Sequence, residues 1–431
     1  MDENRGRLFC LDALRGLDML FLTVAGPLLS AVFAWAGLPK DGFWRTQLSH
    51  PAWGGFTAWD QIMPCFIFMC GAAVPLALKR FLDAEGRPTR AFFTHIGKRF
   101  AMLWALGLFV AGRITSFDVM EIRLYNNTLE AIAAGYVIAA FAFLVKTRWI
   151  RFALPFALAF GYTALLAAFG DMTPEGNFAR IVDVWCMKAL GFPEGAKTFD
   201  LGNYTWFLTS LMFGAMTCWG SNCTEIVRSS LSPWKKAGLL FGFAALLTAV
   251  GWIAQIWIPP VKHVFALSFT ARSMGVCIAL LAALYVLTDI WKFRRGLGVF
   301  VLFGQFALWA YMIGGVFRPG LLGFAKVLCQ GVPHLVGTDT YLAFVEQVVA
   351  CVLLAGVLSL RRRYRAFSLS QDREEKTSVF TPNHSAMKRF CSFFLMAVAI
   401  FSAETAFAGS RIVTDTISSK VLGADVACNV Y

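Results

Sequence analysis

The sequence predicts an all-α, polytopic integral membrane protein with its N-terminus in the cytoplasm. Three observations predict this: a very apolar composition, a series of apolar runs of membrane-spanning length, and basic residues confined to alternate loops. Of the 431 residues, 58% are hydrophobic and only 15% are charged, with a mean hydropathy of +0.62. Soluble chains are about a quarter charged, so this deficit indicates that lipid is the solvent.

Ten apolar runs precede the basic cluster that begins at Arg361. A helix needs about 20 mostly apolar residues to cross a bilayer, and the third run is the shortest of the ten. The predicted cores of the ten spans are residues 13–36, 57–78, 100–114, 128–145, 150–169, 203–220, 237–258, 268–290, 298–317 and 341–359.

The loops after the even-numbered runs are rich in lysine and arginine, whereas the odd loops are sparser in both. The basic loops lie at 79–99, 146–151, 228–236, 292–295 and 361–365. Positive charge marks cytoplasmic loops, so these loops and the N-terminus are predicted to be cytoplasmic. The net charge of +13 is then a consequence of membrane orientation, and no nucleic-acid partner is expected.

The C-terminal part changes character after the predicted transmembrane domain, residues 1–365. Polar residues 366–386 indicate a flexible cytoplasmic linker. Residues 387–408 have a basic start, an apolar middle and an Ala-x-Ala end, a pattern typical of a signal peptide and equally of an eleventh span. Residues 409–431 would then be an exported tail. This tail contains strand-like stretches, faintly resembles the opening of secreted α/β-hydrolase esterases, and suggests a truncated second module.

The 11 cysteines lie mostly inside apolar runs, where thiols behave as small apolar side chains. No CxxC or mixed Cys/His spacing of a zinc site occurs, so the sequence predicts no metal site. The long outer loop at 170–202 contains an apolar stretch, 181–190, which we expect to lie along the membrane surface.

Charged residues open the first predicted span. Asp12, Arg15 and Asp18 are spaced by three residues and therefore share one helical face. Charges inside a bilayer are costly. One interpretation is a salt-bridge stripe that neutralises itself, and the pattern alone favours it. The other is an arginine that two carboxylates hold in place to bind an anion.

A histidine and an acid lie at the outer end of the second predicted span. His50 can act as a general base or accept an acyl group, and Asp60 could fix its tautomer. The alternative is a loop histidine at the headgroup level between interfacial Trp53 and Trp59. That alternative leaves Asp60 unexplained, because an acid entering the membrane usually has a partner.

Two motifs around these residues resemble the heparan-α-glucosaminide N-acetyltransferase family. They are Leu-Asp-Ala-x-Arg-Gly at 11–16 and His-Pro-Ala-Trp-Gly-Gly-Phe-Thr-Ala-Trp-Asp-Gln at 50–61. Acyltransferase-3 type sugar acetylases share the first motif more loosely. The resemblance is sharpest over residues 8–80, and weaker matches extend it to residue 365, at Asn127–Glu130, Lys262–Ser268, Phe303–Gly304 and Tyr311.

The resemblance implies a transmembrane acyltransferase of a bacterial plasma (inner) membrane. Such an enzyme would move an acetyl group from cytoplasmic acetyl-CoA to an amino sugar or a sugar hydroxyl of a glycan on the outer face. His50 would be the active histidine and Asp60 its acid, with Lys262, Trp53 and Gln61 as substrate contacts. The basic residues expected to meet the phosphates of acetyl-CoA are Arg15, Lys79, Arg80 and Arg99. A homodimer is left open.

Several positions depart from the family pattern. Gly26 replaces a usual asparagine of the first span, and Glu130-Ala131 replaces Gln-Arg in the fourth. Phe306 and Gly314 replace an asparagine and a histidine of the ninth span. These differences bear on which acceptor is used.

Two other functions stay open. A transporter without covalent chemistry could use intramembrane charges in a proton-coupled pathway. The residues that such a pathway would use are Asp18, Asp60, Glu130, Arg272 and Glu346. A membrane anchor for the exported tail would instead leave His50 dispensable.

Overall fold

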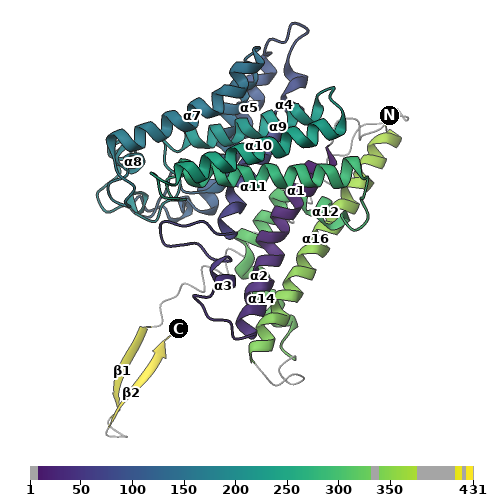
Figure 1. Ribbon diagram of the computed structural model, residues 1–431. Coiled ribbons are helices and arrows are strands. Elements are labelled where there is room, and N and C mark those ends of the chain that lie inside the picture. Colours follow the sequence, from purple (N-terminus) through teal and green to yellow (C-terminus); the bar gives the residue numbers. More distant parts are fainter. Residues whose placement is uncertain (1–7, 332–338, 376–412, 420–423, 431) are drawn as a thin grey trace. The chain divides into compact units, whose positions relative to one another are not determined.

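The computed structural model describes residues 8–331, 339–375, 413–419 and 424–430. The chain divides into two units, Met1–Ser359 and Leu360–Tyr431. The described part of the first unit is helical (Figure 1). The helices, in chain order, are α1 (Phe9–Leu20), α2 (Gly26–Trp35), α3 (Phe43–Thr46), α4 (Ile62–Leu78), α5 (Arg90–Val110), α6 (Thr128–Phe143), α7 (Arg148–Phe169), α8 (Phe178–Ala189), α9 (Ser210–Arg228), α10 (Pro233–Ala254), α11 (Leu267–Tyr285), α12 (Gly298–Gln305), α13 (Ala307–Ala310), α14 (Arg318–Leu328) and α16 (Asp339–Glu375).

Six helical segments of the described chain are long and apolar enough to cross a membrane. They are Phe9–Trp35, Trp59–Phe81, Arg148–Phe169, Pro233–Ala254, Leu267–Ile290 and Phe344–Arg363. The prediction of a helical, membrane-embedded chain is therefore confirmed at this level. The finer count of ten spans stays a prediction.

The other four predicted spans are also helical, and each has a feature that separates it from the six. Helix α5 carries basic residues in its first half, α6 is short, and α9 is comparatively polar. The ninth predicted span is not straight, because segments Gly298–Gln305 and Ala307–Val316 meet at a bend of 84°. Breaks of this kind in membrane proteins occur where backbone lines a cavity or is buried in protein.

The described residues of the predicted linker and of the predicted tail form regular secondary structure. Helix α16 continues through Glu375, so the first ten residues of the predicted linker are helical. Helix formers such as Gln371, Arg373 and Glu374 favour this continuation. The predicted signal-like segment or eleventh span, 387–408, lies outside the described residues. The tail forms an antiparallel hairpin of β1 (Val413–Ser419) and β2 (Ala424–Val430), so the all-α prediction does not extend to it.

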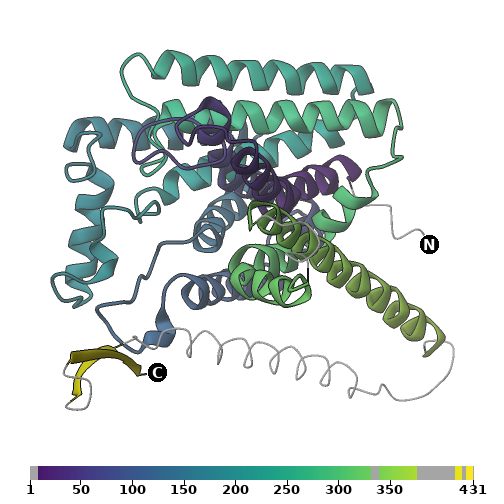
Figure 2. The same cartoon turned by 90° about the horizontal axis from the view of Figure 1, so that it is seen from below.

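Helix α4 lies at the centre of the first unit and packs on α6 and α9. Its span is 72% buried, compared with 28% for the span that contains α7. Small residues allow the backbones to approach: a Cβ on Gly71 would come within 1.9 Å of the Thr217 carbonyl oxygen. Helices α10 and α11 run side by side in both views (Figures 1 and 2). The residues just before α4 are held against the loop that leads into α11 by a hydrogen bond from the Gly55 amide to the Pro260 carbonyl oxygen.

Candidate active site

The loop that carries His50 is fastened to the loop that carries Lys262. The Gly55 amide donates to the Pro260 carbonyl oxygen at 2.8 Å, and Gly54 forms an isolated antiparallel bridge with Val261. These backbone contacts join the start of the second predicted span to the loop before the eighth. The charge pattern of the loops predicts both segments on the same side of the membrane.

Three ionisable side chains converge at this junction. The Nδ1 atom of His50 lies 2.6 Å from Oδ1 of Asp60, and the Nζ atom of Lys262 lies 3.0 Å from the same oxygen. The Nζ atom is also 3.1 Å from His50 Nδ1. Asp60 is fully buried, whereas the His50 side chain is 52% exposed. A buried carboxylate needs such partners, because an unpaired buried charge is costly.

The hydrogen-bond network fixes the expected tautomer of His50. The shorter of the two contacts at Nδ1, the one with Asp60 Oδ1, is a hydrogen bond when Nδ1 carries the proton and donates it, and the 3.1 Å contact of the Lys262 ammonium with Nδ1 is then not a hydrogen bond. The Nε2 atom then keeps its lone pair and is the nitrogen available for chemistry. The Thr57 hydroxyl donates to the other oxygen of Asp60 at 3.0 Å, which leaves the carboxylate held on both sides.

Burial lowers the pKa of two neighbouring basic side chains, Lys262 and His263. Removal from water lowers the pKa of Lys262, and the neighbouring Asp60 carboxylate opposes this by favouring the charged amine. The pKa of the His263 imidazole is also lowered, first by burial and then by the charge of Lys262. His263 is therefore expected to be neutral near pH 7. Its ring stacks on Trp53, with centroids 4.8 Å apart.

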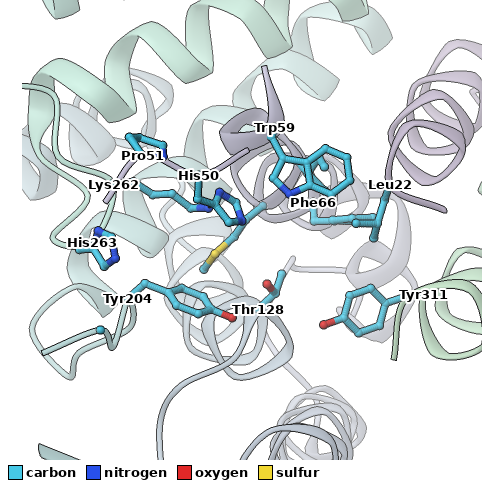
Figure 3. Close-up of a pocket in the computed structure, with 13 residues that line it drawn as sticks. Leu22, His50, Pro51, Trp59, Phe66, Thr128, Tyr204, Lys262, His263 and Tyr311 are labelled. Atoms are coloured by element: carbon cyan, nitrogen blue, oxygen red, sulfur yellow. The ribbon is translucent and has the colours of Figure 1, made fainter. Parts of the chain in front are cut away.

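His50 and Lys262 lie on the wall of a cavity of about 340 Å³ (Figure 3). Trp59, Phe66 and Leu22 form an apolar side of the cavity. Tyr204 and Tyr311 extend their hydroxyl groups toward Thr128 from opposite sides. The cavity therefore combines a histidine with a free Nε2, a lysine and three hydroxyl groups.

A second cavity, of about 440 Å³, adjoins the first. It is lined by Arg15 and Arg99, and it shares Phe66, Thr128 and Tyr311 with the His50 cavity. The arginines belong to parts of the chain whose loop charges predict the opposite side of the membrane from His50. Arg15 also pairs with Asp12 at 3.2 Å. The three shared residues therefore form a junction between a basic cavity and the histidine cavity.

The structure gathers some of the predicted site residues and separates others. His50, Asp60 and Lys262 form one cluster, and Arg15 and Arg99 line the neighbouring cavity. Lys79 and Arg80 are exposed beyond the end of α4 and line neither cavity. Gln61 lines a third cavity. Trp53 supports His263 rather than facing the cavity, and its indole nitrogen donates to the Met172 carbonyl oxygen at 2.7 Å.

Sequence reasoning gave no role to four residues that shape the site: Thr57, Thr128, Tyr204 and Tyr311. Thr57 lies three residues before Asp60, and a hydroxyl one turn before a buried acid is a local signal that could have identified it. Thr128 and Tyr311 lie within stretches that carry the family resemblance. Tyr204 lies in an irregular segment before α9, where no sequence period indicates a direction.

The structure shows the surroundings of three residues that depart from the family pattern: Gly314 in the ninth predicted span, and Glu130 and Ala131 in the fourth. A Cβ on Gly314 would come within 2.7 Å of Leu354 and 2.8 Å of Thr23, so a histidine does not fit there without rearrangement. Ala131 is completely buried. The Glu130 carboxylate accepts a hydrogen bond from the Asn126 amide at 2.7 Å, so it caps the start of α6.

These features define a membrane-embedded helical protein with a His–Asp–Lys cluster at the wall of an internal cavity. Among the described residues, no group of His, Cys, Asp and Glu is arranged to hold a metal ion. A family model described as a domain of unknown function (DUF5009) matches residues 7–160, and the chain is similar to that family over this range. The range includes His50, Asp60 and Arg99 and ends before Lys262. No curated protein matches the chain.

Proposed function

We propose that the chain is a membrane acyltransferase that moves an acetyl group from acetyl-CoA to a sugar hydroxyl or amine of a glycan. One observation carries this proposal. His50, with its free Nε2 and its buried Asp60 partner, faces a cavity that adjoins a second, arginine-lined cavity through shared residues. The loop charges predict the arginines on the cytoplasmic side and His50 on the outer side.

The basic cavity suits the donor. Arginine pairs well with phosphate, so Arg15 and Arg99 are the expected contacts of the nucleotide end of acetyl-CoA. The remaining lining is largely apolar, which suits a thin pantetheine arm. The thioester would then pass the junction at Thr128 and Tyr311 and reach His50.

The chemistry uses the Nε2 lone pair of His50. In the direct route, Nε2 removes the proton of the acceptor hydroxyl or amine while the acceptor oxygen or nitrogen bonds to the acetyl carbon. The carbon–sulfur bond breaks, and the CoA thiolate leaves and takes up a proton. In the two-step route, Nε2 first bonds to the acetyl carbon while the carbon–sulfur bond breaks and the CoA thiolate leaves. The acceptor then bonds to the same carbon, the carbon–Nε2 bond breaks, and the freed Nε2 takes up the acceptor proton. In both routes Asp60 stabilises the positive charge that develops on the ring.

The test is acetyl transfer by the purified full chain in detergent, with a panel of sugars and amino sugars as acceptors. His50→Ala is compared with His95→Ala, because His95 lies on α5, packs its ring at a tilt against Phe81 and lines neither cavity. We expect turnover to be lost in His50→Ala and kept in His95→Ala. Accumulation of a protein heavier by one acetyl group, seen by mass spectrometry without acceptor, would select the two-step route. Absence of acetyl-CoA binding by the wild type would overturn the proposal.

A second candidate function, transport without covalent chemistry, is favoured by the 84° bend between α12 and α13. Broken helices of this kind form substrate sites in many transporters. Against it, the predicted pathway residues do not share one cavity: Asp18 lines the third cavity, and Arg272 stacks between Phe56 and Trp252. Proton-coupled uptake into proteoliposomes that does not depend on acetyl-CoA would support transport.

A further inference from the structure

A third cavity lies on another face of α4 from the basic one. It has a volume of about 270 Å³ and is formed by α1 with its π-helical continuation, Phe21–Ala25, by residues at and just before the start of α4, and by α11. Ile62 lines both this cavity and the His50 cavity, but it is itself buried and separates the two. The third cavity is therefore a distinct space that the proposed acyl transfer does not use.

Two polar side chains on the wall of this cavity carry atoms that lack a hydrogen-bond partner in the described part of the chain, and the Asp18 carboxyl group also interacts with the Cys65 thiol of the same wall. Asp18 is only 8% exposed, and its Oδ2 atom has no hydrogen-bond partner. The Nε2 and Oε1 atoms of Gln61 are likewise buried and unpaired. Each such atom costs about 1–3 kcal/mol unless something satisfies it. The wall therefore offers a carboxyl group and a carboxamide, with both donor and acceptor capacity, to a ligand.

The rest of the lining is hydrocarbon, and it reaches the membrane-facing surface of the helix bundle. Val276 and Leu280 lie one turn apart on α11 and are 37% and 39% exposed. Apolar side chains exposed at mid-span of a membrane helix face lipid. Phe21 and Leu17 continue the apolar wall on the first span. A molecule in the bilayer therefore has access to the cavity from the side.

We propose that this third cavity binds one chain of an uncharged amphiphile from the bilayer, whose hydroxyl or amide head bonds to Asp18 and Gln61. The cavity is at the small end of ligand pockets, so it suits one hydrocarbon chain rather than two. A head that both donates and accepts satisfies the carboxyl group and the carboxamide together. An uncharged head is favoured, because burying an additional ion among hydrocarbon is costly.

The test uses a hexadecanol analogue with an alkyl diazirine, cross-linked by light to the full chain in nanodiscs and mapped by peptide mass spectrometry. We expect the label on the peptide that contains Leu17 and Phe21. Val276→Trp should fill the cavity from the lipid side and lower this label about tenfold, a loss of about 1.4 kcal/mol of binding. Leu246→Trp is the matched control, because Leu246 is an exposed apolar residue of α10 that does not line the cavity. It should keep the label.

Competition and a second variant identify the head group. In the wild type, unlabelled hexadecanol should displace the probe and hexadecane should not. In Gln61→Leu, the two competitors should displace the probe equally. Equal labelling in Val276→Trp and wild type would mean contact with bulk lipid only and would overturn the proposal. Stronger competition by hexadecylamine than by hexadecanol would overturn the uncharged head. None of these measurements depends on acetyl transfer, so the site can fail or stand independently of the proposed enzyme.

Discussion

Gly26 and Trp59 occupy adjoining space: a Cβ atom on Gly26 would lie 2.2 Å from Cζ3 of the Trp59 indole. Trp59 forms part of the wall of the His50 cavity and packs on Phe21, with ring centroids 5.7 Å apart. The asparagine expected at position 26 from the family resemblance is therefore excluded by this tryptophan. The Trp59 indole occupies the space that a side chain at position 26 would need, which explains why glycine replaces the asparagine of the family pattern.

The first prediction tests this pair. Gly26→Asn should overpack the site and destabilise the protein by about 3 kcal/mol, since inserted atoms force neighbouring side chains and backbone to move. Trp59→Leu in the same chain should restore most of the loss, because it removes the atoms in conflict. The measurement is thermal unfolding in detergent. Gly97→Asn is the control, since nothing lies within 4 Å of a Cβ there. Equal losses in both asparagine variants would refute the pairing.

The second prediction concerns Lys262. Lys262→Met leaves the buried Asp60 with one cation fewer, and we expect kcat/KM for acetyl transfer to fall about 100-fold. Because burial lowers the Lys262 pKa, this amine loses its proton at a lower pH than an ordinary lysine. Activity of the wild type should therefore decline in the alkaline range before an exposed lysine would titrate.

The pH profile separates this role from a purely structural one. In Lys262→Met the alkaline decline should be absent, although the residual rate is low. Lys262→Arg, which keeps a charge that does not titrate, should also lack the decline but retain more activity. An alkaline decline that persists in both variants would assign the titration to another group.

The third prediction tests the junction between the two cavities. Thr128→Trp should block the space that the cavities share, whereas Thr128→Ser should preserve it. We expect Thr128→Trp to bind acetyl-CoA about as well as the wild type and to transfer acetyl about 100-fold more slowly, because the thioester cannot reach His50. Binding is measured by calorimetry and transfer by acetylated product. Full transfer by Thr128→Trp would show that the donor uses another route.

Hydropathy predicted the helices well, because each span must satisfy its own backbone hydrogen bonds in lipid. It did not predict the bend at Phe306, since the two halves together form one apolar run of membrane-spanning length, and the break depends on tertiary packing. The same limit applies at the site. The resemblance singled out His50, Asp60 and Lys262, whose spacing of 212 residues between His50 and Lys262 has no local signature. It also grouped Gln61 with them, although Gln61 points to a different cavity.

Neighbouring helical residues diverge in this way because of helix geometry. Asp60 and Gln61 are adjacent in the 3₁₀ turn Trp59–Gln61, and a step of about 120° turns one side chain toward His50 and the other toward the third cavity. Residues in the loops, such as Tyr204, could not be placed from sequence, because their direction depends on contacts between distant segments. One of those contacts comes from α8.

Helix α8 holds the segment that carries Tyr204. The Asp183 carboxylate accepts a hydrogen bond from the Phe207 amide at 2.6 Å, and Asp183 is only 5% exposed. Ile181 and Trp185, on the same helix, are exposed apolar residues. This arrangement agrees with a helix that lies along a membrane surface, although that position stays a prediction. Burial raises the Asp183 pKa to about 7, against the opposing effect of the Phe207 hydrogen bond.

The last prediction follows from this pKa. In the unfolded chain Asp183 titrates near its ordinary value of 3.8, so between about pH 4 and 7 the folded state binds more protons than the unfolded state. The contribution of Asp183 to the free energy of unfolding is therefore greatest below about pH 4. It is lost as the pH rises to about 7, by up to about 4 kcal/mol. Asp183→Asn keeps an acceptor for the Phe207 amide but does not titrate, so it should remove this dependence. The measurement is thermal unfolding in detergent from pH 5 to 8 for both proteins, with Asp171→Asn as an exposed control. Parallel pH curves for wild type and Asp183→Asn would exclude Asp183 as the titrating group.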